Sequence, residues 1–144
     1  MSADESENYH YIQIKTISDT AADLITALTI TSTNEALGLI REAKKLNMPV
    51  VISFTKKTNG KLPSGETLQN AIETIDKETY AYPFYYMINC AHPTQFQSEL
   101  IKESAWLKRI GGVRANASCK SHVEPDECTE LDSGNPKELG QHYK

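Results

Sequence analysis

The chain has 144 residues, a formal net charge of −4 and 39% hydrophobic residues, which is typical of a single folded domain. Its acidic balance argues against a nucleic-acid-binding surface, and no apolar run approaches the roughly 20 residues of a membrane span. Residues 1–9 are polar and acidic, so we expect a disordered tail without a signal peptide, followed by one domain over residues 10–144. Three cysteines argue against a disulfide framework and favour the reducing cytoplasm.

The first half of the chain shows strand and helix signals in alternation. Residues 10–20 have the pattern of the end of a helix, and residues 23–30 form an apolar, partly β-branched run typical of a buried strand. Ser32 and Glu35 have the spacing of a helix capping box, and the apolar residues after them fall on one helical face. Asn47 and Pro49 indicate the end of that helix. Residues 49–55 predict a second buried strand.

The second half repeats the same unit. Residues 56–65 form a polar loop with two glycine turn signals, and a helix follows over the apolar positions Leu68, Ala71, Ile72 and Ile75. Residues 84–90 predict a third strand, residues 96–101 a third helix and residues 110–116 a fourth strand. After a long loop, Asn135 and Pro136 are a typical N-cap and first residue of a last helix, which ends near Tyr143.

Four strands that alternate with helices predict right-handed βαβ units, a parallel sheet and the α/β fold class. Two architectures fit this pattern: a small open doubly wound sheet, or part of a (β/α)₈ barrel with four parallel strands. Both place functional residues at the carboxyl ends of the strands. Neither a Gly-x-Gly-x-x-Gly after the first strand nor a Walker A motif occurs, which disfavours a nucleotide-binding sheet.

Polar side chains and one thiol stand at the predicted carboxyl ends: Thr29, Thr55, Asn89, Cys90 and Asn116. A thiolate at the end of a buried strand binds a soft metal or acts as a nucleophile, whereas a buried thiol is often inert. Asn89 either orients its neighbour by hydrogen bonds or caps the strand. Asn116 either contacts polar groups of a substrate or serves as a turn residue. His92 would be a substitute metal ligand or a plain loop residue.

The order of these segments resembles the homocysteine S-methyltransferase family. The similar pieces are residues 22–25, 35–36, 49–55 and 62–68, Ile88-Asn89-Cys90, and residues 114–118. The resemblance implies a (β/α)₈ barrel, of which this chain would cover strands four to seven. It also implies a methyltransferase that uses zinc to bind a homocysteine-like thiol, which then accepts a methyl group from a donor. On this basis Cys90 would be a metal ligand, and Thr29, Asn89 and Asn116 would bind substrate.

The chain also departs from the family. Members carry a Gly-Gly-Cys-Cys pair that supplies two further zinc ligands, and this chain has only Cys119 and Cys128, which are not adjacent. Leu28 stands where members that use homocysteine commonly have a glutamate. We therefore expect the chain alone to be inactive as an enzyme.

Three hypotheses follow from the match and the departures. The chain is a methyltransferase part that needs a complementing barrel half, an inactive half-barrel that serves as an assembly or interaction module, or an unrelated small α/β protein. In either half-barrel hypothesis the open strand edges favour self-association or pairing with the complementing half.

Overall fold

The computed structural model describes residues 1–101, 103–118 and 134–143. Its centre is a sheet of four strands: β1 (Ile25–Ile30), β2 (Val50–Thr55), β3 (Tyr86–Asn89) and β4 (Ile110–Arg114). The strands lie in the order β1-β2-β3-β4, and each pairs in parallel with the next. The predicted α/β class and sequential parallel order are confirmed, and the sheet is consistent with part of a (β/α)₈ barrel.

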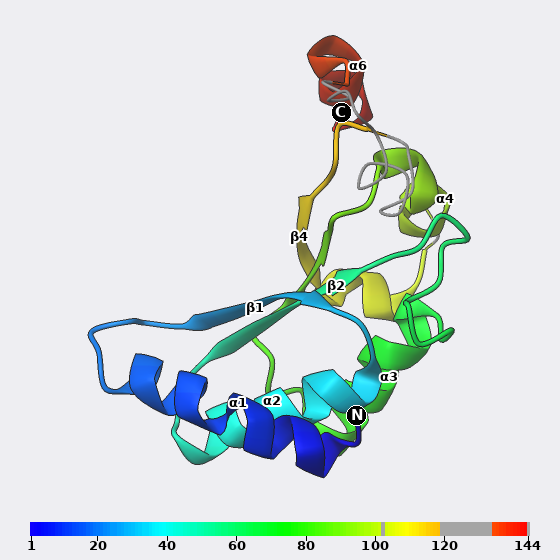
Figure 1. The fold of residues 1–144 in the computed structure, drawn as a ribbon. Coiled ribbons are helices and arrows are strands. Elements are labelled where there is room, and N and C mark those ends of the chain that lie inside the picture. Colours follow the sequence, from blue (N-terminus) through cyan, green and yellow to red (C-terminus); the bar gives the residue numbers. More distant parts are fainter. Residues whose placement is uncertain (102, 119–133, 144) are drawn as a thin grey trace.

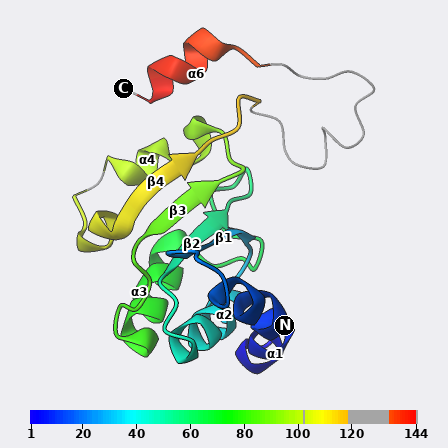
Figure 2. The ribbon, with the colours of Figure 1, turned by 90° about the vertical axis from the view of Figure 1, so that its left-hand side faces the viewer.

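Helices α1 (Ala3–Ser18), α2 (Thr33–Lys45) and α3 (Leu68–Thr79) lie side by side on one face of the sheet (Figures 1 and 2). Shorter elements surround β4: the 3₁₀ turns η1 (Pro93–Gln95) and η2 (Ala105–Arg109), and the helices α4 (Gln97–Leu100) and α6 (Pro136–His142). Within the described part of the chain, every helix is too short or too polar to cross a membrane.

The first helix begins earlier than the sequence suggested. We expected a disordered tail over residues 1–9, but α1 starts at Ala3, so that prediction is wrong. The Ser2 hydroxyl accepts the Glu5 N–H at 3.2 Å, and the Glu5 carboxylate accepts the Ser2 N–H at 2.7 Å. This capping box satisfies two backbone donors at the start of the helix. Ser6 is buried against α2, where Gly38 leaves no room for a Cβ beside it, so polar and small residues build this end of the helix.

The hydrophobic core lies between the sheet and helices α1 to α3. On the side of β2 that faces the helices, Ile52 and Phe54 are fully buried, as are Ile40 of α2 and Ile72 of α3. All six residues of β2 are buried, whereas β4 has no fully buried residue. On the other face of the sheet, Ser53 of the central strand β2 is buried, whereas Leu28 of the outer strand β1 is 43% exposed.

A bulge in β4 depends on a glycine. Tyr86 of β3 pairs with Ile110, but the next residue of β3 pairs with Gly112, so Gly111 is an extra residue in β4. A Cβ at Gly111 would lie 2.6 Å from the ring of Tyr85. Only glycine therefore fits at this bulge without displacing the tyrosine.

An ion pair connects α3 with the start of β4. Arg109 donates from Nε to Asp76 Oδ2 at 2.7 Å and from Nη2 to Asp76 Oδ1 at 3.2 Å, and it also donates to the Pro83 carbonyl at 2.6 Å. The Tyr86 hydroxyl donates to Asp76 Oδ1 at 2.8 Å. Burial, and then the Asp76 carboxylate, raise the pKa of Tyr86 well above its ordinary value, so this hydroxyl remains a donor.

Candidate functional site

Four residues from the carboxyl ends of β1, β2 and β3 meet around one buried amide. We call Thr29, Ser53, Asn89 and Cys90 the rim cluster. Asn89 Oδ1 accepts the Ser53 hydroxyl at 2.6 Å and the Thr29 N–H at 3.0 Å. Asn89 Nδ2 donates to Thr29 Oγ1 at 2.9 Å and to Cys90 Sγ at 3.1 Å. Both the oxygen and the nitrogen of the amide thus form hydrogen bonds, and these bonds hold the ends of three strands in a fixed arrangement.

The backbone of this cluster is strained at two positions. Thr29 has φ = 63° and Cys90 has φ = 54°, a left-handed conformation that is uncommon for residues other than glycine and that clusters at functional sites. Thr29 lies in a bulge of β1, because Ala27 pairs with Ile52 whereas Ile30 pairs with Phe54. The two strained residues approach each other, with Thr29 Oγ1 at 3.9 Å from Cys90 Sγ.

The structure brings together three of the four residues that the sequence singled out. Thr29, Asn89 and Cys90 share the rim cluster. Asn116 lies on the same rim, because its N–H donates to the Ala91 carbonyl at 3.0 Å. Among the described residues, the Asn116 side chain makes no hydrogen bond to the cluster. The predicted contacts of Thr29, Asn89 and Asn116 with substrate stay predictions.

Thr55 and Leu28 complete the surroundings of the cluster. Thr55 pairs in register with Asn89, and its buried hydroxyl has no hydrogen-bond partner in the described part of the chain. Leu28 is 43% exposed at the adjacent end of β1. The accessible side of the rim therefore includes an apolar side chain at the end of β1.

Sequence reasoning missed Ser53, which is the donor that fixes Asn89. A signal existed, because Ser53 stands two residues before the end of β2 and so shares a sheet face with Thr55. The pairing of Thr55 with Asn89 then brings the Ser53 hydroxyl to the Asn89 amide. A serine that is buried in an otherwise apolar strand needs such a partner.

The loop before α2 departs from the predicted capping box. The Ser32 hydroxyl accepts the Glu35 N–H at 3.2 Å, as expected. The Glu35 carboxylate, however, accepts the Thr31 N–H at 2.9 Å and the Thr31 hydroxyl at 2.7 Å. Half of the predicted box is therefore formed, and the glutamate fixes the residue that follows β1 instead.

A second carboxylate fixes the loop after β2. Glu66 accepts the Thr33 N–H at 2.8 Å, the Thr33 hydroxyl at 2.5 Å and the Ser64 hydroxyl at 2.8 Å. Partial burial acts to raise the pKa of Glu66, but the hydrogen bonds from Thr33 and Ser64 outweigh it and hold the pKa below its usual value. The loop is thereby anchored on the N-terminus of α2, where a negative charge is favourable.

An ion pair with one fully buried side chain joins the segments that follow β2 and β3. Lys56 follows the last residue of β2, and its side chain is fully buried. Its Nζ lies 2.7 Å from Glu99 Oε1 on α4. This pair ties the loop after β2 to the segment that follows β3, since a buried ammonium needs a charged partner.

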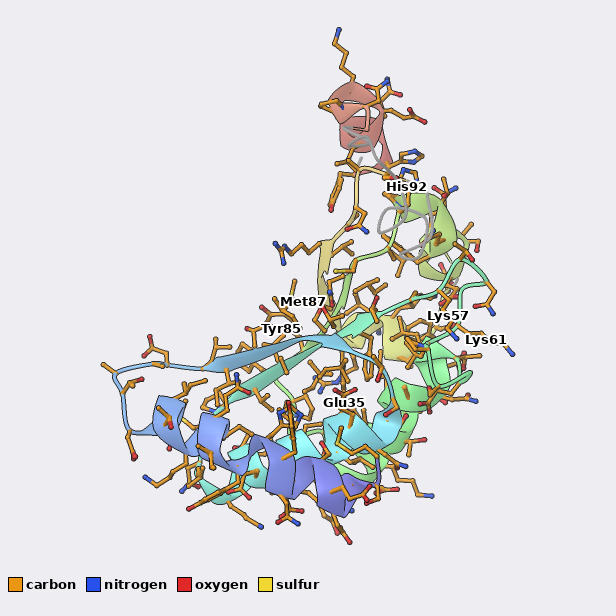
Figure 3. All side chains as sticks on the ribbon, viewed as in Figure 1. Glu35, Lys57, Lys61, Tyr85, Met87 and His92 are labelled. Carbon is orange, nitrogen blue, oxygen red and sulfur yellow. The ribbon has the colours of Figure 1, made fainter. Side chains whose placement is uncertain are left out.

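The described residues do not form a complete metal site. They contain no group of three or more histidine, cysteine, aspartate or glutamate side chains arranged to hold a metal ion. His92, which is labelled in Figure 3, is buried. Its Nδ1 lies 2.9 Å from Thr94 Oγ1, and its ring lies 5.3 Å from that of His142. Cys119 and Cys128 lie outside the described residues. A structural or catalytic zinc site usually has three or four protein ligands, so Cys90 with its neighbours does not fit zinc unaided.

Comparison with known proteins gives one consistent family. Residues 1–144 match the family described as homocysteine S-methyltransferase. The chain is 31% identical over 111 residues to homocysteine S-methyltransferase 1 of Arabidopsis thaliana, and 30% identical over 109 residues to homocysteine S-methyltransferase 1 of Brassica oleracea var. italica. These matches cover 76% and 74% of this chain but 33% and 32% of the relatives. The chain therefore spans about a third of their length. No solved structure matches it.

Proposed function

We propose that this chain, which belongs to the homocysteine S-methyltransferase family, forms part of a thiol S-methyltransferase. In this proposal the rim cluster is the end of the active site that binds the sulfur of the thiol substrate. The carrying observation is the Asn89 amide, which holds the Cys90 sulfur at 3.1 Å beside Thr29. In the proposed reaction a homocysteine-like thiol gives its proton to water, and its sulfur forms a bond to the methyl carbon of a donor. The bond between that carbon and the donor breaks, and the donor leaves with the electrons of that bond.

The chain's own residues would orient this chemistry. The side-chain amide of Asn89 donates a hydrogen bond to Cys90 Sγ, and such a bond would stabilise negative charge on that sulfur. Ser53 and the Thr29 N–H hold Asn89 in the orientation that makes this donation. Asn116 on the adjacent strand end would contact the polar groups of the substrate. Because donors and acceptors are already aligned, little reorganisation is needed when charge develops.

Zinc belongs to this proposal through the family resemblance, with Cys90 as one ligand. When bound, zinc stabilises a thiolate near neutral pH. The remaining ligands are not found among the described residues, so the metal would need ligands from outside them. Leu28 further disfavours a free amino acid as the thiol substrate, because its side chain cannot balance an ammonium charge. A reducing compartment such as the cytoplasm would keep the Cys90 sulfur reduced, as this role requires.

A second candidate function is a catalytically inactive half-barrel that acts as an assembly or interaction module. The exposed apolar side chains favour it, since Leu28 is 43% exposed and Phe84 is 70% exposed. Such a module would self-associate or pair with a complementing barrel half, because strand edges and apolar surface both gain from being covered.

The test is to assay zinc content and methylation of N-acetylhomocysteine, a homocysteine-like thiol without an ammonium group, first with the chain alone and then with the chain co-expressed with the rest of the Arabidopsis relative. We expect neither tight zinc nor methylation from the chain alone. With the complement we expect both, and we expect both to be lost in Cys90→Ser. Cys119→Ser and Cys128→Ser are matched controls that should retain them.

Two results would count against the proposal. Methylation that survives in Cys90→Ser would remove the proposed role of that sulfur. A folded complex without zinc or methylation would favour the interaction module instead.

A further inference from the structure

One charged residue stands in the four described strands of the sheet. Strands β1 to β3 contain no aspartate, glutamate, lysine, arginine or histidine, and β4 contains only Arg114, its last residue. Arg114 pairs in register with Asn89 of β3, and the Arg114 carbonyl accepts the Cys90 N–H at 3.2 Å. A cation therefore lies on the strand next to the amide that contacts the Cys90 sulfur.

The Arg114 side chain shares a face of the sheet with the rim cluster. Residues that pair in register on neighbouring parallel strands direct their side chains to the same face, so Arg114 and Asn89 project together. The Asn89 amide meets the Ser53 hydroxyl on that face, and the backbones of adjacent strands are about 4.8 Å apart. Arg114 is exposed, so its guanidinium is open to a ligand that also reaches the rim cluster.

No carboxylate neutralises this guanidinium among the described residues. The chain has three arginines. Arg41 pairs with Asp4 at 3.1 Å, and Arg109 pairs with Asp76 at 2.7 Å. Arg114 forms no ion pair and no side-chain hydrogen bond within the part of the chain that the structure describes. Its five N–H donors are therefore available to an anionic ligand.

The strand residues that surround Arg114 on this face are uncharged and partly apolar. Met87, which Figure 3 labels, is half-buried two residues before Asn89. It packs over Gly112 of β4, because a Cβ at Gly112 would lie 3.1 Å from Met87 Cε. Leu28 at the end of β1 is 43% exposed. An anionic group that reaches Arg114 thus meets a cation without a competing carboxylate from the strands, and the hydrocarbon part of such a ligand meets apolar side chains.

The charges of the rim select among thiols. A guanidinium binds a carboxylate through two parallel N–H···O bonds, whereas it repels an ammonium group at the same place. The apolar Leu28 supplies no negative charge that would offset this repulsion. The described part of the rim therefore favours an acid and disfavours a free amine.

We infer that Arg114 binds a carboxylate of the thiol substrate, so that the site takes a thiol acid without a free ammonium group. This inference rests on the proposed function, because it takes the substrate sulfur to lie at the rim cluster. Arg114 is then a specificity-determining residue. It holds the acid end of the substrate while the rim cluster faces the sulfur end, and it takes no part in the transfer of the methyl group.

The probes are N-acetylhomocysteine, its C-terminal amide, which lacks the carboxylate, and free homocysteine, which has an ammonium group. Isothermal titration calorimetry in a reducing buffer measures their binding to the full chain and to its complex with the rest of the Arabidopsis relative. We expect the acid to bind about fivefold more tightly than its amide, the upper range for an exposed charged pair. Free homocysteine should bind more weakly than N-acetylhomocysteine, and high salt should reduce the preference for the acid.

Three variants separate a specific carboxylate contact from general charge. Arg114→Gln should abolish the preference for the acid and leave binding of the amide unchanged. Arg114→Lys keeps the charge but not the paired donors, so it should retain part of the preference. Lys108→Gln is the matched control, because it removes one exposed positive charge just before the other end of β4; it should leave the preference unchanged.

Four outcomes would overturn the inference. They are the absence of saturable N-acetylhomocysteine binding to either protein, equal binding of the acid and the amide, a preference for the acid that survives Arg114→Gln, and tighter binding of free homocysteine. None of these measurements uses methylation. Methylation without a preference for the acid would therefore reject the role of Arg114 and keep the Cys90 proposal. A preference that depends on Arg114 in a complex that does not methylate would do the reverse.

Discussion

The sheet has two unequal regions, β1 to β3 beneath helices α1 to α3, and β4 with the short elements around it (Figure 1). In the first region β2 is buried along its whole length, whereas every residue of β4 is exposed or half-buried. The rim cluster comes entirely from the first region, and Asn116 comes from the second. The difference indicates that the rim cluster is held firmly, whereas the end of β4 that carries Asn116 is held loosely.

The lengths of the connecting helices explain this inequality. α2 has 13 residues and α3 has 12, whereas α4 has four. A helix of one turn buries little apolar surface on a strand. β4 is held in place instead by polar interactions. These include the Arg109–Asp76 ion pair and a hydrogen bond from the Ala115 N–H to the Tyr143 hydroxyl at 3.0 Å.

Core truncation should give the largest contrast between the regions. Ile52 is fully buried in β2, so Ile52→Ala should cost about 2–5 kcal/mol of unfolding free energy through lost transfer energy and a cavity. Val113 in β4 is half-buried, and Val113→Ala should cost less than about 1 kcal/mol. Urea denaturation followed by circular dichroism measures both. Equal losses would mean that β4 is as tightly packed as β2.

The two asparagines of the rim offer the next contrast. Asn89→Ala would leave the buried Ser53 hydroxyl and the Thr29 N–H without their acceptor and should cost about 2–3 kcal/mol. Asn116→Ala should change stability by no more than about 0.5 kcal/mol. The same denaturation experiment compares them, with the mobility of a thiol-directed label on Cys90 as a local readout. A label equally immobile in Asn89→Ala and in the unchanged chain would contradict the role given to the amide.

The Arg109–Asp76 ion pair, which joins the two regions, can be removed by a single substitution. Arg109→Ala removes the partner of Asp76, and because the Arg109 and Asp76 side chains are 27% and 21% exposed, solvent reduces the expected cost to about 1–2 kcal/mol. Amide exchange should accelerate in β4 and stay slow in β2. Lys108→Ala is the neighbouring control, since Lys108 is exposed. Uniform acceleration across the sheet would show that the two regions unfold as one unit.

The smallest effect should come from the anchored loop after β2. The pKa of Glu66 is lower in the folded chain than its usual value of 4.5. Its charge therefore contributes stability above pH 4.5 that is lost as pH falls through the folded pKa. Glu66→Gln should flatten this acid dependence in thermal melts between pH 3 and 6, roughly the carboxyl titration range. Glu73→Gln on the exposed face of α3 is the control and should retain the dependence.

Local sequence patterns were sufficient to predict most of the helices and strands, because hydrophobic periodicity and turn residues determine structure over short stretches of chain. The run 84–90 predicted β3, and the spacing of Leu68, Ala71 and Ile75 predicted α3. The start of α1 was missed, since its first turn is stabilised by a cap and by close contact with Gly38 and not by apolar periodicity. The third predicted helix became a short turn and α4, with Ile101 82% exposed.

By itself the sequence determined that Asn89 and Cys90 end a buried strand, and that Thr29 and Asn116 end two others, because parallel strands place such ends on one rim. Only the tertiary structure decided which of these side chains touch. Thr29 and Asn89 are 60 residues apart, and their contact depends on the bulge that turns Thr29 into the left-handed conformation. The hydrogen bond from Ser53 to Asn89 and the position of Arg114 beside Asn89 likewise arise from strand register, which no local stretch of residues specifies.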